Sequence, residues 1–131
     1  MAKKKMVLAI DDNVQQLNEF KAMLGEEYDL RVVKAASEAI SFLNKNKVDV
    51  ILLDIEMPNI SGFEFLKDIR MLLSYKYAPI IIVSGNSGKE FIDKAREFEA
   101  NAVLKKPVSA KGLIDAIEKT YADAGNFRGK E

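Results

Sequence analysis

The chain has 131 residues, and its 20 basic residues balance its 20 acidic residues, so bulk charge does not favour direct binding to nucleic acid. It contains neither cysteine nor histidine, which excludes disulfide frameworks, thiol nucleophiles, zinc–thiolate sites and the commonest general base. No apolar stretch approaches the ~20 residues of a membrane span, and the run after the basic N-terminus is too short for a signal peptide. We therefore expect one cytoplasmic globular domain without membrane insertion, whose chemistry depends on carboxylates, hydroxyls, lysine and a hard cation.

Short apolar runs alternate with segments of helical periodicity along the chain. The runs comprise residues 6–10, 30–33, 48–53, 79–83 and 102–104. The third and fourth are continuous and rich in valine and isoleucine, which is typical of parallel strands buried on both faces. The second run is more polar, so we expect it near an edge of the sheet.

Between and after these runs, apolar residues recur at three- and four-residue steps and predict five helices. The marker residues are Val14, Leu17, Phe20 and Leu24; Ala39, Ile40 and Leu43; Phe63, Leu66, Ile69 and Leu73; Phe91, Ala95 and Phe98; and Leu113, Ile114, Ile117 and Tyr121. Gly25 is expected to end the first helix, and Ser37 and Ser109 to cap the second and the fifth. Residues 122–131 are expected to form a polar tail or a truncated linker.

The fivefold alternation of strand and helix predicts a single α/β domain in which right-handed crossovers join parallel strands. We expect a doubly wound, flavodoxin-like sheet of five parallel strands in the order 2-1-3-4-5, with helices on both faces. The core of this domain should comprise about residues 4–121.

Carboxylates follow two of the buried strands directly. The first run ends in Asp11 and Asp12, and the third ends in Asp54. The carboxyl ends of parallel strands meet at one edge of the sheet, where ligands bind in open α/β folds. Three clustered carboxylates repel one another unless a cation lies among them, and oxygen ligands favour a hard metal. The sequence therefore predicts a site for Mg²⁺, with Mn²⁺ as a substitute.

Two further groups are expected at the same edge. The fourth run leads into Ser84, and the fifth leads into Lys105 and Lys106 before Pro107. A carboxylate, a cation, a hydroxyl and a lysine are the parts needed to receive a phosphoryl group. The carboxylate is the nucleophile, and the two positive charges neutralise the transferring oxygens.

This constellation closely resembles the receiver domain of two-component response regulators, in particular the chemotaxis response regulators. The residues that carry the resemblance are Asp11-Asp12, Asp54 with Met57-Pro58 and Gly62, Ser84, and Lys106-Pro107. The resemblance implies that Asp54 is the phospho-acceptor. It implies that Asp12, Asp54 and the backbone carbonyl of Glu56 bind Mg²⁺ directly, while Asp11 acts largely through water.

The same resemblance assigns roles at the ends of the last two strands. Ser84 would hydrogen-bond a phosphoryl oxygen, and Lys106 rather than Lys105 would pair with the phosphate, because the family's lysine immediately precedes a proline. The Lys106–Pro107 peptide bond would be cis. One residue departs from the pattern, because Val103 stands where receivers usually carry an aromatic ring that changes rotamer on activation. Valine is stiff at χ1 and cannot make that movement.

The resemblance also implies a phosphorylation switch that catalyses only its own phosphorylation and dephosphorylation. The phosphoryl group would come from a phosphohistidine on a sensor histidine kinase or a histidine phosphotransfer protein. The output would pass to a downstream protein through the face formed by the fourth helix, the fifth strand and the fifth helix, roughly residues 87–121.

Three other functions stay open at this point. The chain could be a receiver-like docking module that is never phosphorylated, which the valine at position 103 keeps open. An aspartyl-nucleophile phosphatase would need a second aspartate two residues after the nucleophile, where Glu56 stands. A flavodoxin-like FMN carrier would need a hydroxyl- and glycine-rich loop after the first strand, where Asp11, Asp12 and Asn13 stand instead.

Overall fold

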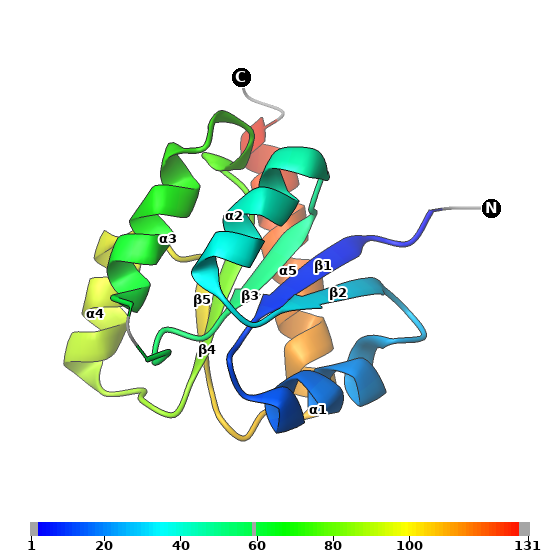
Figure 1. Ribbon diagram of the computed structural model, residues 1–131, viewed down its shortest axis with the longest axis horizontal. Coiled ribbons are helices and arrows are strands. Elements are labelled where there is room, and N and C mark those ends of the chain that lie inside the picture. The colour runs from blue at the N-terminus through cyan, green and yellow to red at the C-terminus, as the bar shows by residue number, and fades with distance from the viewer. Residues whose placement is uncertain (1–2, 59, 129–131) are drawn as a thin grey trace.

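The computed structural model describes residues 3–58 and 60–128, which form a five-stranded sheet covered by helices on both faces (Figure 1). The strands are β1 (Met6–Ile10), β2 (Asp29–Val33), β3 (Val50–Leu53), β4 (Ile80–Ser84) and β5 (Ala102–Lys105). The helices are α1 (Val14–Leu24), α2 (Ala36–Lys45), α3 (Gly62–Met71), α4 (Lys89–Glu97) and α5 (Ala110–Arg128), with a 3₁₀ helix η1 (Leu73–Tyr75) after α3. All strand pairs are parallel and their order is β2-β1-β3-β4-β5, so the predicted fold and the edge position of the second strand are confirmed.

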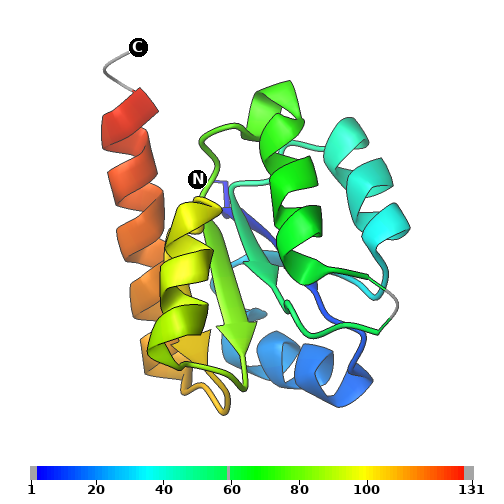
Figure 2. The same ribbon diagram turned by 90° about the vertical axis from the view of Figure 1, so that its left-hand side faces the viewer.

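The sheet separates two apolar layers, because successive side chains of each strand point to opposite faces. Leu8 and Ile10 of β1 pack with α2, α3 and α4 in one cluster, whereas Val7 and Ala9 pack with α1 and α5 in the other. Figure 2 shows α2 and α3 (cyan and green) on one side of the strands and α5 (orange to red) on the other. Strands β3 and β4 are buried along their whole length, which explains their continuous runs of valine, isoleucine and leucine.

Backbone hydrogen bonds align the carboxyl ends of the strands at one level. The N–H of Asp11 donates to the carbonyl of Val33 at 3.2 Å, and the N–H of Asp54 donates to the carbonyl of Ile10 at 3.0 Å. Between β5 and β4, at the edge of the sheet away from β2, the N–H of Lys106 donates to the carbonyl of Ser84 at 2.8 Å. The residues that follow β1, β3 and β5 are therefore fixed by the sheet itself and are not carried on free loops.

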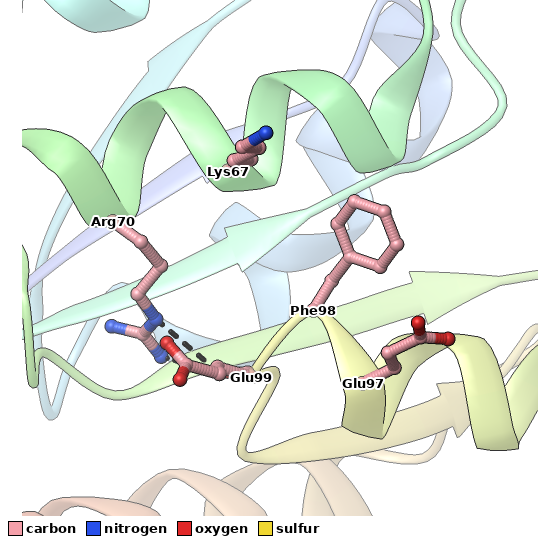
Figure 3. A pocket seen from close by; sticks show the side chains of 5 residues that line it. All are labelled: Lys67, Arg70, Glu97, Phe98 and Glu99. Carbon is pink, nitrogen blue, oxygen red and sulfur yellow. Dashed lines mark hydrogen bonds between the residues drawn. The ribbon is translucent and has the colours of Figure 1, made fainter.

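At the opposite end of the strands, where β4 and β5 begin, Arg70 links several segments by hydrogen bonds. Its guanidinium extends from α3 towards the turn after α4 (Figure 3). Its five N–H donors are matched by five hydrogen bonds. The acceptors are the carbonyls of Tyr75, Ala78 and Glu99, the last used twice, and the side-chain oxygen of Asn101. Burial lowers the pKa of Arg70 to about 10. The shallow hollow lined by Lys67, Arg70 and Phe98 therefore lies where hydrogen bonds connect α3 to the turn after α4. It is at the opposite end of the strands from Asp11 and Asp54.

Helix boundaries differ from the expectation at three places. The N-cap of α2 is Ala35, which makes no side-chain cap bond, so Ser37 lies inside the helix and its predicted role as the cap is wrong. Helix α3 ends at Met71, and Leu73 lies in η1 with 91% of its surface exposed, so it does not belong to the apolar face of α3. Helix α5 continues to Arg128 and buries Ala124, so residues 122–128 are helical and do not form the predicted tail. Residues 129–131 lie outside the described residues.

Other local predictions are confirmed. The hydroxyl of Ser109 accepts from the N–H of Gly112 at 3.0 Å and so caps α5. Gly25 ends α1 with its N–H bonded to the carbonyl of Lys21, in a right-handed conformation with φ of −61°. The Lys106–Pro107 peptide bond is cis.

Candidate functional site

Asp54 occupies the first position after β3 and is 6% exposed. One of its carboxylate oxygens, Oδ1, accepts a hydrogen bond at 3.0 Å from the backbone N–H of Glu56. This local turn, in which an aspartate bonds to the backbone two residues later, bends the chain away from the sheet. It fixes the carboxylate at the strand end, with Oδ2 facing Lys106.

Asp11 repeats this geometry at the end of β1. Its Oδ1 accepts from the backbone N–H of Asn13 at 2.9 Å, and the residue is 1% exposed. Asp12 follows it and is exposed to solvent. Carboxylate oxygens of Asp11, Asp12 and Asp54 all lie within 4.8 Å of one another, so the structure brings the predicted acidic cluster together.

Lys106 supplies the positive charge of the cluster. Its Nζ lies 3.1 Å from Oδ2 of Asp11 and 3.7 Å from Oδ2 of Asp54, and 24% of the side chain is exposed. Lys105, the preceding residue, is exposed at the end of β5. Of these two lysines, Lys106 is therefore the one whose ammonium reaches the aspartates.

The electrostatics of the site call for a further cation. Burial raises the pKa of Asp54, and the neighbouring charge of Asp11 raises it further. The hydrogen bond from the Glu56 N–H and the charge of Lys106 lower this pKa and offset part of the rise. When all groups are charged, three carboxylates face one ammonium, so two negative charges stay uncompensated. An all-oxygen donor set with one exposed member fits a hard divalent cation that keeps part of its water.

Ser84, the last residue of β4, is fully buried, and its hydroxyl already has two partners. It donates to Oε1 of Glu56 and accepts from the backbone N–H of Asn86 at 3.1 Å. The family resemblance implies a role only for the backbone carbonyl of Glu56, so this use of its carboxylate was not predicted. No sequence signal indicates this contact, because the direction of the Glu56 side chain is set by the turn that follows β3.

Val103 is half-buried in β5 and packs against the cluster formed with α2, α3 and α4. Its register partner in β4 is Ile82, two residues before Ser84. The position expected to carry a mobile aromatic ring therefore contributes a small, stiff side chain to the core.

The fold and these residues match a known family. The model of the response regulator receiver domain matches residues 7–118, which includes every site residue described above. The chain belongs to this family of two-component signalling proteins.

Solved and curated relatives agree with this membership. The chemotaxis protein CheY4 of Vibrio cholerae superposes with a TM-score of 0.86 at 28% identity, over 90% of this chain and 99% of that one. The polar-differentiation response regulator DivK of Brucella ovis is 26% identical over 121 residues, or 92% of this chain and 98% of that protein. A protein-glutamate methylesterase/protein-glutamine glutaminase of Myxococcus xanthus is 36% identical over 104 residues, but the match spans only 29% of that protein.

Within the part of the chain that the structure describes, no helix is long and apolar enough to cross a membrane. This agrees with the short apolar runs of the sequence.

Proposed function

We propose that this receiver domain is phosphorylated on Asp54 and acts as a switch for protein–protein signalling. The observation that carries the proposal is the position of Lys106, whose ammonium lies between the carboxylates of Asp11 and Asp54 at the carboxyl edge of the sheet. A lysine held beside a buried carboxylate nucleophile is suited to neutralise an incoming phosphoryl group.

The chemistry follows from the groups present. A carboxylate oxygen of Asp54 forms a bond to phosphorus while the nitrogen–phosphorus bond of a donor phosphohistidine breaks. The donor imidazole keeps the electron pair of that bond and is neutralised by a proton from solvent. The Glu56 N–H orients the nucleophile, and Lys106 pairs with the phosphoryl oxygens. Attack by water on the aspartyl phosphate later returns inorganic phosphate and free Asp54.

The acidic cluster supports a requirement for a divalent cation, Mg²⁺ or Mn²⁺. Asp12 and Asp54, together with the backbone carbonyl of Glu56, would hold it directly, and Asp11 would act largely through water. When bound, the cation neutralises charge on the carboxylates and on the phosphoryl oxygens. Lys106 contributes positive charge to the same carboxylates through its contacts with Asp11 and Asp54.

Family membership supports the choice of partners. A sensor histidine kinase or a histidine phosphotransfer protein would supply the phosphoryl group, and a downstream protein would bind the face made of α4, β5 and α5. In this reading the chain is not an enzyme with an external substrate beyond its phosphodonor.

The test is the intact mass of the protein after treatment with acetyl phosphate and Mg²⁺. We expect the parent to gain the mass of one phosphoryl group and the Asp54→Ala variant to gain none. Asp68→Ala, which removes an exposed carboxylate from α3, is the matched control and should behave like the parent. Equal labelling of the parent and Asp54→Ala would refute Asp54 as the acceptor, and absence of labelling in the parent would favour a docking module.

A further inference from the structure

The hydroxyl of Ser84 is not free to meet a phosphoryl group. It is fully buried, it donates to the Glu56 carboxylate, and it accepts from the N–H of Asn86. A hydroxyl has one hydrogen to donate. To donate to a phosphoryl oxygen on Asp54, Ser84 must first release Glu56.

Glu56 is well placed to act as a removable cover. The residue is exposed, so its carboxylate reaches inwards from the solvent side to a hydroxyl that is itself inaccessible. A Cβ built on Gly85 would lie 4.0 Å from Oε1 of Glu56, and no closer neighbour is found there. The carboxylate therefore lies beside the start of the loop after β4, and because Glu56 is an exposed residue its side chain can swing into water.

We propose that the Glu56 side chain is a latch that holds Ser84 and the loop after β4 in the unphosphorylated state. This inference rests on the proposed function, because the phosphoryl group is what competes with Glu56 for the Ser84 hydroxyl. Phosphorylation then has two linked parts: the Glu56 carboxylate swings into solvent, and the hydroxyl turns to a phosphoryl oxygen. The residue two positions after Asp54 thereby sets how readily the switch closes.

The charge of the latch acts in the same direction as its hydrogen bond. Glu56 holds a carboxylate at the Ser84 hydroxyl, where a phosphoryl oxygen on Asp54 would have to arrive, and like charges oppose an incoming anion. Replacing Glu56 by glutamine keeps an acceptor for Ser84 but removes the charge. Replacing it by alanine removes both, so the two variants separate the contributions.

The phosphoryl mimic beryllofluoride gives the direct test, titrated in saturating Mg²⁺ and followed by backbone amide NMR. We expect Glu56→Ala to bind it about tenfold more tightly than the parent, the factor expected for loss of one charge-assisted hydrogen bond, with Glu56→Gln in between. Glu26→Gln, in the exposed turn after α1, is the control and should match the parent.

A double-mutant cycle with Ser84→Ala shows whether Glu56 acts through Ser84. On the Ser84→Ala background, the effect of Glu56→Ala should fall well below tenfold, because the latched hydroxyl is gone and only the effect of the Glu56 charge remains. An undiminished tenfold effect on that background, or affinities of Glu56→Ala and the parent within twofold, would overturn the latch.

A second readout needs neither metal nor phosphoryl group. Amide hydrogen exchange at residues 85–88 should be about tenfold faster in Glu56→Ala than in the parent, because the loop has lost its anchor. Unchanged exchange there would overturn the latch even if Asp54 is phosphorylated. Conversely, failure of the parent to bind beryllofluoride would refute the proposed function, while faster exchange would still support the contact.

Discussion

Asp54 lies in an environment that works against its own charge. Burial raises the pKa of this carboxyl group, and the neighbouring charge of Asp11 adds to the effect. A raised pKa means that the folded protein binds the proton more tightly than the unfolded chain. Stability therefore falls as pH rises from the ordinary carboxyl range through the raised pKa, and the ionised side chain is a liability at neutral pH.

Asp54→Asn should accordingly stabilise the metal-free protein at pH 7, by on the order of 1 kcal/mol or roughly 2–5 °C in Tm. The amide can still accept from the Glu56 N–H, and Lys106 keeps Asp11 as its partner. The gain should shrink below the ordinary carboxyl pKa, where the proton is bound in both states. Thermal unfolding in chelator at several pH values measures it, with Asp68→Asn as the exposed control; a lower Tm for Asp54→Asn at pH 7 would contradict the account.

The two adjacent lysines provide a second test at this scale. Lys106→Ala removes the ammonium that faces Asp11 and Asp54, so it should slow phosphorylation by acetyl phosphate on the order of 10²-fold. Lys105 is exposed, so Lys105→Ala should change the rate less than twofold, a bound set by the small effects of most surface substitutions. Initial rates of mass gain compare them, and similar losses in the two variants would contradict the assignment.

Among the elements, the entry into α3 is the most tightly constrained. A Cβ on Gly62 would lie 2.3 Å from the carbonyl oxygen and 2.6 Å from the Cα of Ile55, both backbone atoms that cannot move aside. This contact seats α3 against the turn that follows Asp54. Glycine at position 62 is therefore a requirement of packing, and the turn that positions the nucleophile depends on it.

Gly62→Ala should destabilise the fold by about 2–3 kcal/mol, because the overlap forces the backbone apart. At Gly88 the nearest atom would lie 3.6 Å from the new Cβ, so Gly88→Ala is the matched control with a smaller loss. Urea denaturation measures both free energies of unfolding. Equal losses in the two variants would show that the contact with Ile55 does not matter.

Sequence periodicity predicted the elements well where burial dictates the pattern. Strands β3 and β4 are buried on both faces, so their runs of valine, isoleucine and leucine leave little ambiguity. The errors lie where local backbone geometry decides. Leu72 adopts an extended conformation at the end of α3 and turns Leu73 outwards, and Ala35 starts α2 without a side-chain cap, so Ser37 is enclosed in the helix.

The candidate site was predictable in its positions but not in all its contacts. Asp11, Asp54, Ser84 and Lys106 lie at or directly after the carboxyl ends of strands, and a parallel sheet must bring such ends together. The Glu56–Ser84 hydrogen bond was missed because it depends on a side-chain direction after a turn. Likewise, the guanidinium of Arg70 bonds to acceptors in two separate segments, residues 75–78 and 99–101, which no local sequence pattern reveals.

For the molecule as a whole, the open question is how a change at Asp54 reaches the surface. Helix α4 follows the loop after Ser84; of its residues, all described, only Ala95 is buried. An aromatic contact adds to its attachment, since the ring of Phe91 contacts that of Phe63 with centroids 5.4 Å apart. Helix α4 is thus lightly anchored, whereas Val103 in β5 is a stiff part of the core.

We therefore expect the signal to leave through residues 85–94 rather than through β5. Gly85 and Gly88 can absorb the backbone change when the loop moves. With beryllofluoride and Mg²⁺, the largest amide shifts outside the pocket should fall within residues 85–94. Larger shifts at residues 100–104, with 85–94 unmoved, would contradict this route.

The most direct test of the central claim is the cation dependence of phosphorylation at Asp54. Intact mass should be recorded after acetyl phosphate treatment with Mg²⁺ and with chelator, for the parent, Asp12→Ala and Asp54→Ala. We predict one added phosphoryl group on the parent in Mg²⁺ only, less on Asp12→Ala at limiting Mg²⁺, and none on Asp54→Ala. Full phosphorylation of the parent in chelator, or any stoichiometric phosphorylation of Asp54→Ala, would contradict the account.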